Sequence, residues 1–235
     1  MHLDLEEQEQ VETLKAWWST IGKWIALGLV LVFVAYIAYK GYGKYQDKVS
    51  SEAAAVYETA VLAGMNKDLP QVLKTTEQLQ QQYASTAYAS MSGLLAANLS
   101  NSVGDNAGAL KQLAWVEEKS AYDDLKNLAR LRMVSILLDV GDQAALAQAD
   151  TLLKKSPADG FQGVQLERRG DWYFVQDKKA EALTSYRDAW DILSKEAAKA
   201  QGQKELDPMV RELEKRNPDE ARRLLKVKID SLGGF

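Results

Sequence analysis

Residues 170–189, GDWYFVQDKKAEALTSYRDA, decide the fold. Small and aromatic residues recur in this stretch at helical spacings, at Gly170, Tyr173, Ala182, Tyr186 and Ala189. Small side chains let two helices approach closely, and aromatic side chains fill the groove between neighbouring helix pairs. The polar residues VQDKK between the two apolar runs indicate a turn. The stretch therefore predicts two helices that form a hairpin.

Three earlier turns are similar to this one. The four turns read NKDLPQVL at 66–73, VGDNAGAL at 103–110, VGDQAALA at 140–147 and VQDKKAEAL at 175–183. Their aspartates, Asp68, Asp105, Asp142 and Asp177, are 37, 37 and 35 residues apart. Because an aspartate side chain can accept from an unpaired N–H of a helix's first turn, we expect each one to cap the second helix of its hairpin. The period predicts stacked helical hairpins, and the alternative is a helical bundle with similar turns by chance.

The last hairpin resembles the tetratricopeptide (TPR) pattern of a small residue and Tyr on the first helix, then Ala, an aromatic residue and Ala on the second. Ser194 occupies the place of the usual closing proline, and Asn98 and Ser135 occupy the place of Gly170 in earlier units. The resemblance therefore implies a TPR-like domain.

Apolar residues recur at helical spacing after Gly43 and strand signals are missing, which predicts an all-α domain. The predicted stripes are Ala54, Tyr57, Val61 and Leu62; Leu69, Val72, Leu73, Thr76 and Leu79; and Ala87, Met91, Leu94, Leu95 and Leu99. A capping residue before Pro218 predicts a last helix over 218–232, which covers the end of the array. Its predicted buried face holds Ala221, Leu224, Leu225 and Ile229. We interpret residues 201–217 as an inserted loop with a short helix.

An apolar stretch near the N-terminus, IGKWIALGLVLVFVAYIAY at 21–39, holds one charge, Lys23. Nineteen helical residues reach roughly 28 Å, close to the thickness of a bilayer hydrocarbon core. Tryptophans precede the stretch and tyrosines follow it, as in the aromatic belts of membrane helices. The stretch predicts a transmembrane helix; the alternatives are a cleaved signal peptide, which would be shorter and end in a small-residue site, and a buried core helix.

These features divide the chain into four predicted segments. They are an acidic and amphipathic tail at 1–20, a transmembrane helix at 21–40, a juxtamembrane linker at 41–52 and the TPR-like domain with its capping helix at 53–235. Lys15 and Lys23 precede the span, whereas Lys40, Lys44 and Lys48 follow it, and this count slightly favours a cytoplasmic C-terminus. Large domains translocate largely regardless of flanking lysines, so the count leaves the orientation open.

Composition argues against enzymatic chemistry. The 235 residues include no cysteine and one histidine, His2, which removes the usual thiolate and imidazole nucleophiles, bases and metal ligands. No phosphate-binding glycine loop, nucleophile elbow or metal motif is present. We therefore predict no catalytic, cofactor-binding or metal-binding residues and no cofactor. The 29 basic and 33 acidic residues are mixed along the chain, which argues against nucleic-acid binding.

The chain resembles the YfgM family, the ancillary TPR-like subunit of the bacterial SecYEG translocon. Three segments carry the resemblance, QVETLKAWWSTIGKWIALGLVLVFVAYIAYKGY at 10–42, SEAAAVYETAV at 51–61 and LLKVKIDSL at 224–232. The extra length at 201–217 departs from the family and puts in doubt any partner contact made by that end.

The resemblance implies a single-pass protein of the bacterial inner membrane, with its N-terminus in the cytoplasm and its C-terminal domain in the periplasm. It also implies association with SecYEG and with a PpiD-like periplasmic chaperone, and assistance to exported client proteins after translocation. The alternative is a membrane-anchored TPR scaffold that organises cell-envelope or division proteins by peptide capture. A groove with a Lys, Arg and Asn carboxylate clamp would favour peptide-tail capture, whereas an apolar groove lined by Tyr and Met would favour unfolded clients.

Overall fold

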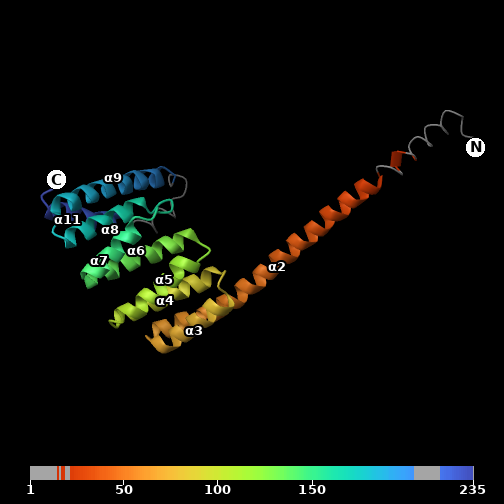
Figure 1. Cartoon of the computed structure of the whole chain (residues 1–235), viewed down its shortest axis with the longest axis horizontal. Helices are drawn as coiled ribbons and strands as arrows, with labels where there is room; N and C mark the ends of the chain where they lie inside the picture. The colour runs from red at the N-terminus through yellow and green to blue at the C-terminus, as the bar shows by residue number, and fades with distance from the viewer. Residues whose placement is uncertain (1–14, 16, 19–21, 204–217, 235) are drawn as a thin grey trace, which may run out of the picture. The chain divides into compact units, whose positions relative to one another are not determined.

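The computed structural model describes residues 15, 17, 18, 22–203 and 218–234, which hold nine helices and no strand (Figure 1). The all-α prediction is confirmed. The helices are α2 (Lys23–Met65), α3 (Leu69–Gln82), α4 (Ala87–Ser102), α5 (Asn106–Lys119), α6 (Asp123–Val140), α7 (Gln143–Leu153), α8 (Gln162–Val175), α9 (Lys179–Gln203) and α11 (Pro218–Ser231). Backbone contacts divide the chain into two compact units, Met1–Glu52 and Ala53–Phe235.

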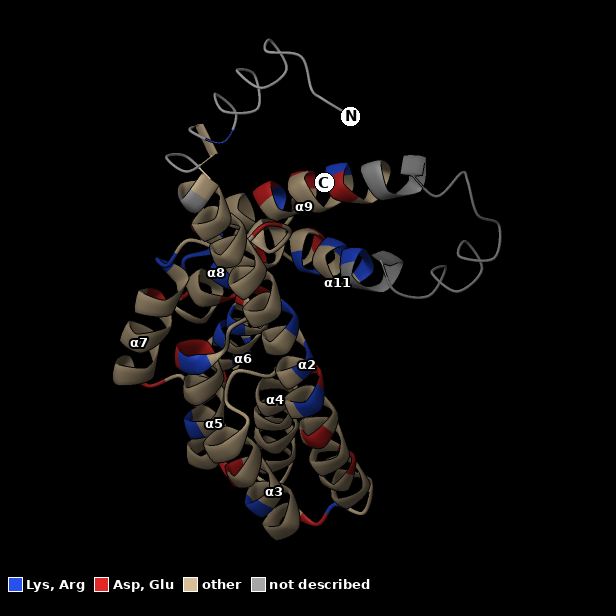
Figure 2. Ribbon diagram, turned by 90° about the vertical axis from the view of Figure 1, so that its right-hand side faces the viewer, with Lys and Arg blue, Asp and Glu red and all other residues tan. Residues whose placement is uncertain are grey.

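Helix α2 begins with the predicted transmembrane stretch. Its large apolar side chains between Trp24 and Tyr39 are all exposed, and Figure 2 shows this part of the ribbon without charged residues. A helix that is apolar on every face needs an apolar environment on every face. Within the described residues, α2 is long and apolar enough to cross a membrane, as the sequence predicted for 21–40, although Ile21 lies outside them. Residues 41–52, the predicted linker, continue the same helix.

The second unit is a series of helical hairpins. Helices α4 and α5, α6 and α7, and α8 and α9 pack in pairs, and the first helices of successive pairs also touch, α4 with α6 and α6 with α8. The end of α2 packs with α3 in the same way, through Ala63 and Val72. This arrangement is the predicted stacked array.

Three of the four predicted aspartate caps are present. The Oδ1 atoms of Asp68, Asp105 and Asp142 accept from backbone N–H groups at 3.1, 2.9 and 2.7 Å, at the starts of α3, α5 and α7. The prediction for Asp177 was wrong. Asp177 has a φ of 59° and precedes Lys178, which occupies the position before the first residue of α9.

The left-handed residue of each turn gives the correct register of the repeats. These residues are Lys67, Gly104, Gly141 and Asp177, and they are 37, 37 and 36 residues apart. Counting back from them, the structural equivalents of Gly170 are Ala60, Ala97 and Val134, all buried. The earlier assignment of Asn98 and Ser135 to this place was therefore off by one residue, because the fourth turn carries its aspartate one position earlier.

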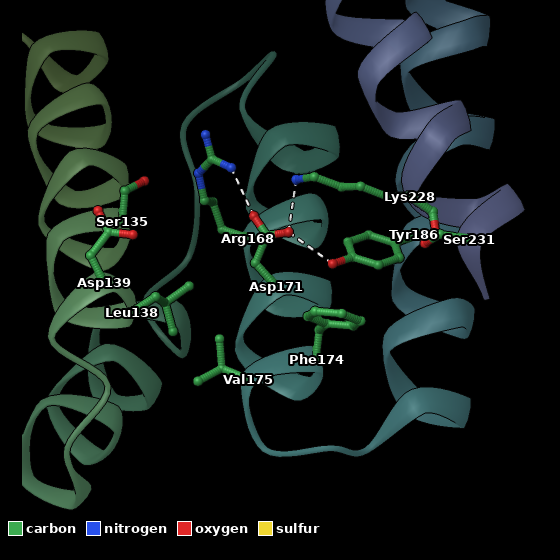
Figure 3. Close-up of a pocket in the computed structure, with 10 residues that line it drawn as sticks. All are labelled: Ser135, Leu138, Asp139, Arg168, Asp171, Phe174, Val175, Tyr186, Lys228 and Ser231. Atoms are coloured by element: carbon green, nitrogen blue, oxygen red, sulfur yellow. Dashed lines mark hydrogen bonds and ion pairs between the residues drawn. The ribbon is translucent and has the colours of Figure 1, made fainter.

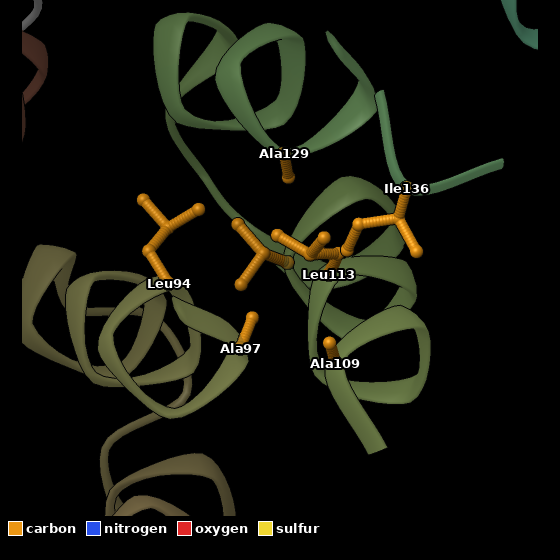
Figure 4. Packing of buried hydrophobic residues seen from close by; sticks show 7 residues of the cluster. Leu94, Ala97, Ala109, Leu113, Ala129 and Ile136 are labelled. Atoms are coloured by element: carbon orange, nitrogen blue, oxygen red, sulfur yellow. The ribbon is translucent and has the colours of Figure 1, made fainter. Parts of the chain in front are cut away.

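Small residues form much of the interior of the array. In the central cluster, Ala97 from α4, Ala109 from α5 and Ala129 from α6 surround the larger Leu113 and Ile136 (Figure 4). Small residues opposite large ones allow adjacent helices to pack closely without voids. Of the predicted stripes, Val72, Thr76, Leu79 and Leu94 are buried, but Leu62 and Met91 are exposed.

Helix α11 covers the last hairpin, as predicted. Leu225 and Ile229 are fully buried against Ala182, Tyr186 and Ala189 of α9. The prediction for Leu224 was wrong, because its side chain is 61% exposed. The side chain of Ala221 and the whole of 204–217, which includes most of the predicted inserted loop, lie outside the described residues, whereas 201–203 belong to α9.

Candidate functional site

A pocket of about 370 Å³ lies between α6, α8, α9 and α11. Figure 3 shows α6 on one side, α9 and α11 on the other, and α8 between them. Polar and apolar residues both line it: Ser135, Leu138, Asp139, Arg168, Asp171, Phe174, Val175, Tyr186, Lys228 and Ser231. All of these residues belong to the second unit.

Helix α8 packs closely against α9 because the buried residues of α8 are two glycines. A Cβ at Gly170 would lie 2.4 Å from two ring atoms of Tyr186, and a Cβ at Gly163 would lie 2.6 Å from Cγ of Leu193. Both glycines therefore let α9 pack directly on the α8 backbone. This close packing brings the Tyr186 hydroxyl to Asp171, one residue after Gly170. The sequence predicted that small residues let the two helices approach, and it placed the aromatic residues between neighbouring hairpins, whereas Tyr186 packs on Gly170 within its own hairpin.

Asp171 forms the polar floor of the pocket. Its Oδ1 accepts from the Tyr186 hydroxyl at 2.8 Å and from Lys228 Nζ at 2.7 Å, while its Oδ2 accepts from Arg168 Nη1 at 2.8 Å. Lys228 Nζ also lies 2.7 Å from Oε1 of Glu167. Dashed lines in Figure 3 mark the contacts of Asp171. We call Glu167, Arg168, Asp171, Tyr186 and Lys228 the Asp171 cluster.

The Asp171 cluster fixes the protonation of its tyrosine. Burial raises the pKa of Tyr186 far above its usual range, and the charge of Asp171 and the hydrogen bond to it raise that pKa further. Tyr186 therefore remains a neutral hydrogen-bond donor to Asp171. Lys228 Nζ also lies 5.5 Å from the centre of the Tyr186 ring, so the cation contacts both the ring and the carboxylates. These contacts join α11 to α8 and α9.

A second carboxylate cluster lies outside the pocket, between α5 and α6. Glu117 Oε1 is 2.7 Å from Lys155 Nζ and 3.3 Å from Arg130 Nη2. Arg130 also donates to the carbonyl of Ser156 at 3.0 Å. Burial alone would raise the pKa of Glu117, but the hydrogen bond and charge of Lys155, followed by those of Arg130, lower it overall. We call Glu117, Arg130 and Lys155 the Glu117 cluster. Its contacts join α5, α6 and the segment after α7, which is a structural role.

The pocket does not supply a free carboxylate clamp. Its two cations, Arg168 and Lys228, are already paired with Asp171 and Glu167. Its aromatic residues are Phe174 and Tyr186, which fits the apolar type of groove in part, although no methionine lines it. Within the described residues, no group of three His, Cys, Asp or Glu residues could hold a metal ion, and His2 lies outside them.

Sequence reasoning left the protein-binding residues unknown, and the pocket residues were missed. Leu138, Asp139, Phe174 and Val175 all lie at the C-terminal ends of α6 and α8. The available signal was the apolar residue that precedes each hairpin turn, such as Val175 in VQD. This apolar residue was interpreted only as part of the turn.

A tetratricopeptide repeat-like domain model matches residues 15–234. The chain is 33% identical over 238 residues to the ancillary SecYEG translocon subunit of Neisseria gonorrhoeae, covering 99% of this chain and 100% of that protein. The chain belongs to the family of ancillary SecYEG translocon subunits. This family membership confirms the resemblance seen in the sequence.

Two more distant members carry the same name. The protein of Haemophilus influenzae is 23% identical over 80% of this chain and 91% of its own length. The protein of Escherichia coli K12 is 24% identical over 81% of this chain and 88% of its own length. No solved structure matches the chain. Both matches therefore cover about four fifths of this chain and most of the length of each relative.

Proposed function

We propose that this chain is a non-enzymatic ancillary subunit of the bacterial Sec translocon. The observation that carries the proposal is the combination, in one chain, of an exposed apolar helix and a TPR-like array, in a family whose members are named for the translocon. The apolar part of α2 anchors the protein in the inner membrane. Residues 53–235 lie in the periplasm and contact SecYEG, a PpiD-like chaperone and exported clients.

Tethering is the physical mechanism of this role. A membrane anchor removes much of the translational freedom that two partners would lose on meeting, and it raises their effective concentration. Weak contacts of the repeat array are then sufficient to hold a partner beside the channel. Such a role requires a binding surface, not a reactive group. The buried charged clusters around Asp171 and Glu117 supply rigidity to that surface.

The proposal is tested by affinity purification of the tagged full-length chain from solubilised membranes. We expect SecYEG and a periplasmic chaperone to co-purify at stoichiometric levels. In a matched variant, residues 24–39 are replaced by an unrelated transmembrane helix of equal length, which keeps the anchor and changes the span. If the natural chain retains neither the translocon nor a chaperone, the proposed function is wrong; the variant shows which contacts require the span itself.

Orientation is tested separately, and the cysteine-free sequence makes the experiment simple. Ser102 is exposed at the end of α4, so Ser102→Cys gives one accessible thiol in the repeat array, and His2→Cys gives one at the N-terminus. A membrane-impermeant maleimide added to spheroplasts should label the Ser102→Cys variant directly and the His2→Cys variant only after lysis. The reverse result would place the array in the cytoplasm.

The alternative function, a scaffold that captures peptide tails, makes a different demand on the pocket. Capture of a terminal carboxylate needs unpaired cations, but Lys228 and Arg168 are both neutralised within the Asp171 cluster. A ligand carboxylate would have to displace a paired one. The observed pairing therefore favours the translocon role over carboxylate-specific capture.

A further inference from the structure

The mouth of the pocket is apolar and exposed. Phe174 is 49% exposed and Val175 46%, and Leu138 lines the same pocket. Val140, next to the lining residue Asp139, is also exposed. Single exposed apolar residues are normal on protein surfaces, but apolar residues gathered around a pocket indicate a binding site. The core does not need Phe174 and Val175, because Tyr173 supplies the packing at the end of α8, whereas Leu138 also packs against the cluster that holds Leu137.

The charge available to a ligand at this mouth is negative. Both cations of the pocket are paired with Asp171 or Glu167, although the buried Nε of Arg168 has no hydrogen-bond partner in the described part of the chain. Asp139 is exposed, lines the pocket and makes no hydrogen bond or ion pair with any residue in the described part of the chain. An unpaired carboxylate beside apolar side chains favours a ligand that presents a cation next to an apolar group.

The pattern continues along the array beyond the pocket. Met65 and Val175, two positions before the left-handed residue of their turns, and Val103 and Val140, one position before it, are all exposed. Exposed aspartates follow in the turns, at Asp68, Asp105, Asp142 and Asp177. Because the hairpins stack in the same sense, their turns follow one edge of the array (Figure 1). An extended polypeptide can follow such an edge, whereas a small molecule would use one pocket only.

From these observations we propose that the pocket mouth, formed by Leu138, Asp139, Phe174 and Val175, docks a polypeptide segment in which apolar residues alternate with lysine or arginine. The proposal rests on the proposed function and deepens it, since it names the chemistry of the segment that the array holds. Apolar side chains enter between Phe174 and Leu138, and a neighbouring cation pairs with Asp139. The pocket volume lies within the range of about 300–1,000 Å³ that is usual for ligand pockets.

The test uses the full-length chain in zwitterionic lipid nanodiscs, with empty nanodiscs as the baseline. The probes are three fluorescein-labelled peptides on one Gly-Ser background, which carry Leu-Lys pairs, Leu-Glu pairs or Ser-Lys pairs. Fluorescence anisotropy should show saturable binding of the Leu-Lys peptide and at least about fivefold weaker binding of the other two, the factor expected for loss of one ion pair or one apolar anchor. Raising the salt concentration should weaken the binding, because the ion pair is exposed.

Variants assign the binding to the pocket mouth. Asp139→Lys and Phe174→Gln should each weaken the Leu-Lys peptide about fivefold or more, and Asp139→Lys should improve binding of the Leu-Glu peptide. The matched controls are Asp188→Lys, an exposed acid on α9, and Leu224→Gln, an exposed apolar residue on α11; neither lines the pocket. Both controls should bind like the natural chain, and circular dichroism should show equal helix content in all variants.

Two outcomes overturn the proposal. One is absence of saturable Leu-Lys binding, and the other is equal weakening by the control and pocket variants. If either occurs while SecYEG still co-purifies with the chain, the docking site is wrong and the translocon role stands. If SecYEG fails to co-purify but the peptide results are as expected, the docking chemistry stands and the translocon assignment fails.

Discussion

The first three hairpins and the fourth solve the same packing problem with different residues. At the small position of the first helix, the first three have Ala60, Ala97 and Val134, whereas the fourth has Gly170. An aspartate precedes the second helix in the first three, but Lys178 does so in the fourth. The fourth hairpin also contains Asp171, a carboxylate surrounded by cations.

The difference shows what the end of a repeat array requires. Inner hairpins bury mainly apolar faces on both neighbours, and their charged contact, the Glu117 cluster, joins hairpins to each other and not to a capping helix. The fourth hairpin must hold α11, which follows a long connecting segment, and it does so with a polar cluster as well as with Leu225 and Ile229. The polar floor of the pocket is a result of this capping arrangement.

Asp171→Ala should have the largest effect. It leaves Lys228, Arg168 and the Tyr186 hydroxyl without their shared acceptor, and breaking a buried ion-pair group in this way costs several kcal/mol. Because Lys228 and Arg168 each keep 30% of their side-chain exposure, we expect a loss of about 2 kcal/mol in the free energy of unfolding. Urea unfolding of the full-length chain in detergent, followed by circular dichroism, measures it.

Hydrogen exchange locates the effect of Asp171→Ala. Amides of α11 should exchange faster in this variant, whereas those of α4 and α5 should be unchanged. Asp188→Ala removes an exposed acid of α9 as the matched control and should alter neither. Unchanged protection of α11 in Asp171→Ala would mean that Leu225, Ile229 and the remaining Lys228–Glu167 pair hold the capping helix without Asp171.

Gly170→Ala should be the second largest change. Alanine is favoured over glycine in helices by about 1 kcal/mol, but the new Cβ would lie 2.4 Å from the Tyr186 ring. Over-packing costs about 1–3 kcal/mol, so a net loss of about 1 kcal/mol is expected in urea unfolding. Gly43→Ala is the control, since no atom lies within 4 Å of a Cβ there, and it should not destabilise the chain. A stabilised Gly170→Ala variant would show that Tyr186 can move away freely.

Sequence alone predicted the helical class, the four hairpins and the close approach of helices at small residues such as Gly170, because these depend on local spacing. It misplaced the repeat register because Asp177 looks like a cap in VQD, and only its left-handed backbone shows that it is not. It missed the pocket because Asp139 and Lys228 look like ordinary residues of solvated helix faces. Their roles depend on where α11 docks, and local spacing in the sequence does not give that position.

The Glu117 cluster should give a smaller, pH-dependent effect. The lowered pKa of Glu117 means that the folded state binds the proton of this carboxyl group less well than the unfolded state does. The stabilisation is therefore complete above the usual value of 4.5 and is lost as the pH falls through the lower folded-state pKa. Glu117→Gln should cost about 1 kcal/mol at neutral pH and nothing at strongly acidic pH. A difference from the natural chain that stays constant across this range would contradict the assignment.

The fourth turn offers the smallest and most specific test, since Lys178 stands where the other turns have a capping aspartate. Lys178 Nζ lies 5.5 Å from the centre of the Trp172 ring, so Lys178→Asp gains a cap but loses a cation–π contact. Lys178→Ala separates the two, because it loses the contact without gaining the cap. We expect Lys178→Asp to exceed Lys178→Ala in stability by about 1 kcal/mol and the natural chain by only about 0.5 kcal/mol. If the two variants were equally stable, the backbone N–H groups at the start of α9 would not need a side-chain acceptor. The fourth turn would then differ from the other three, whose aspartates cap their helices.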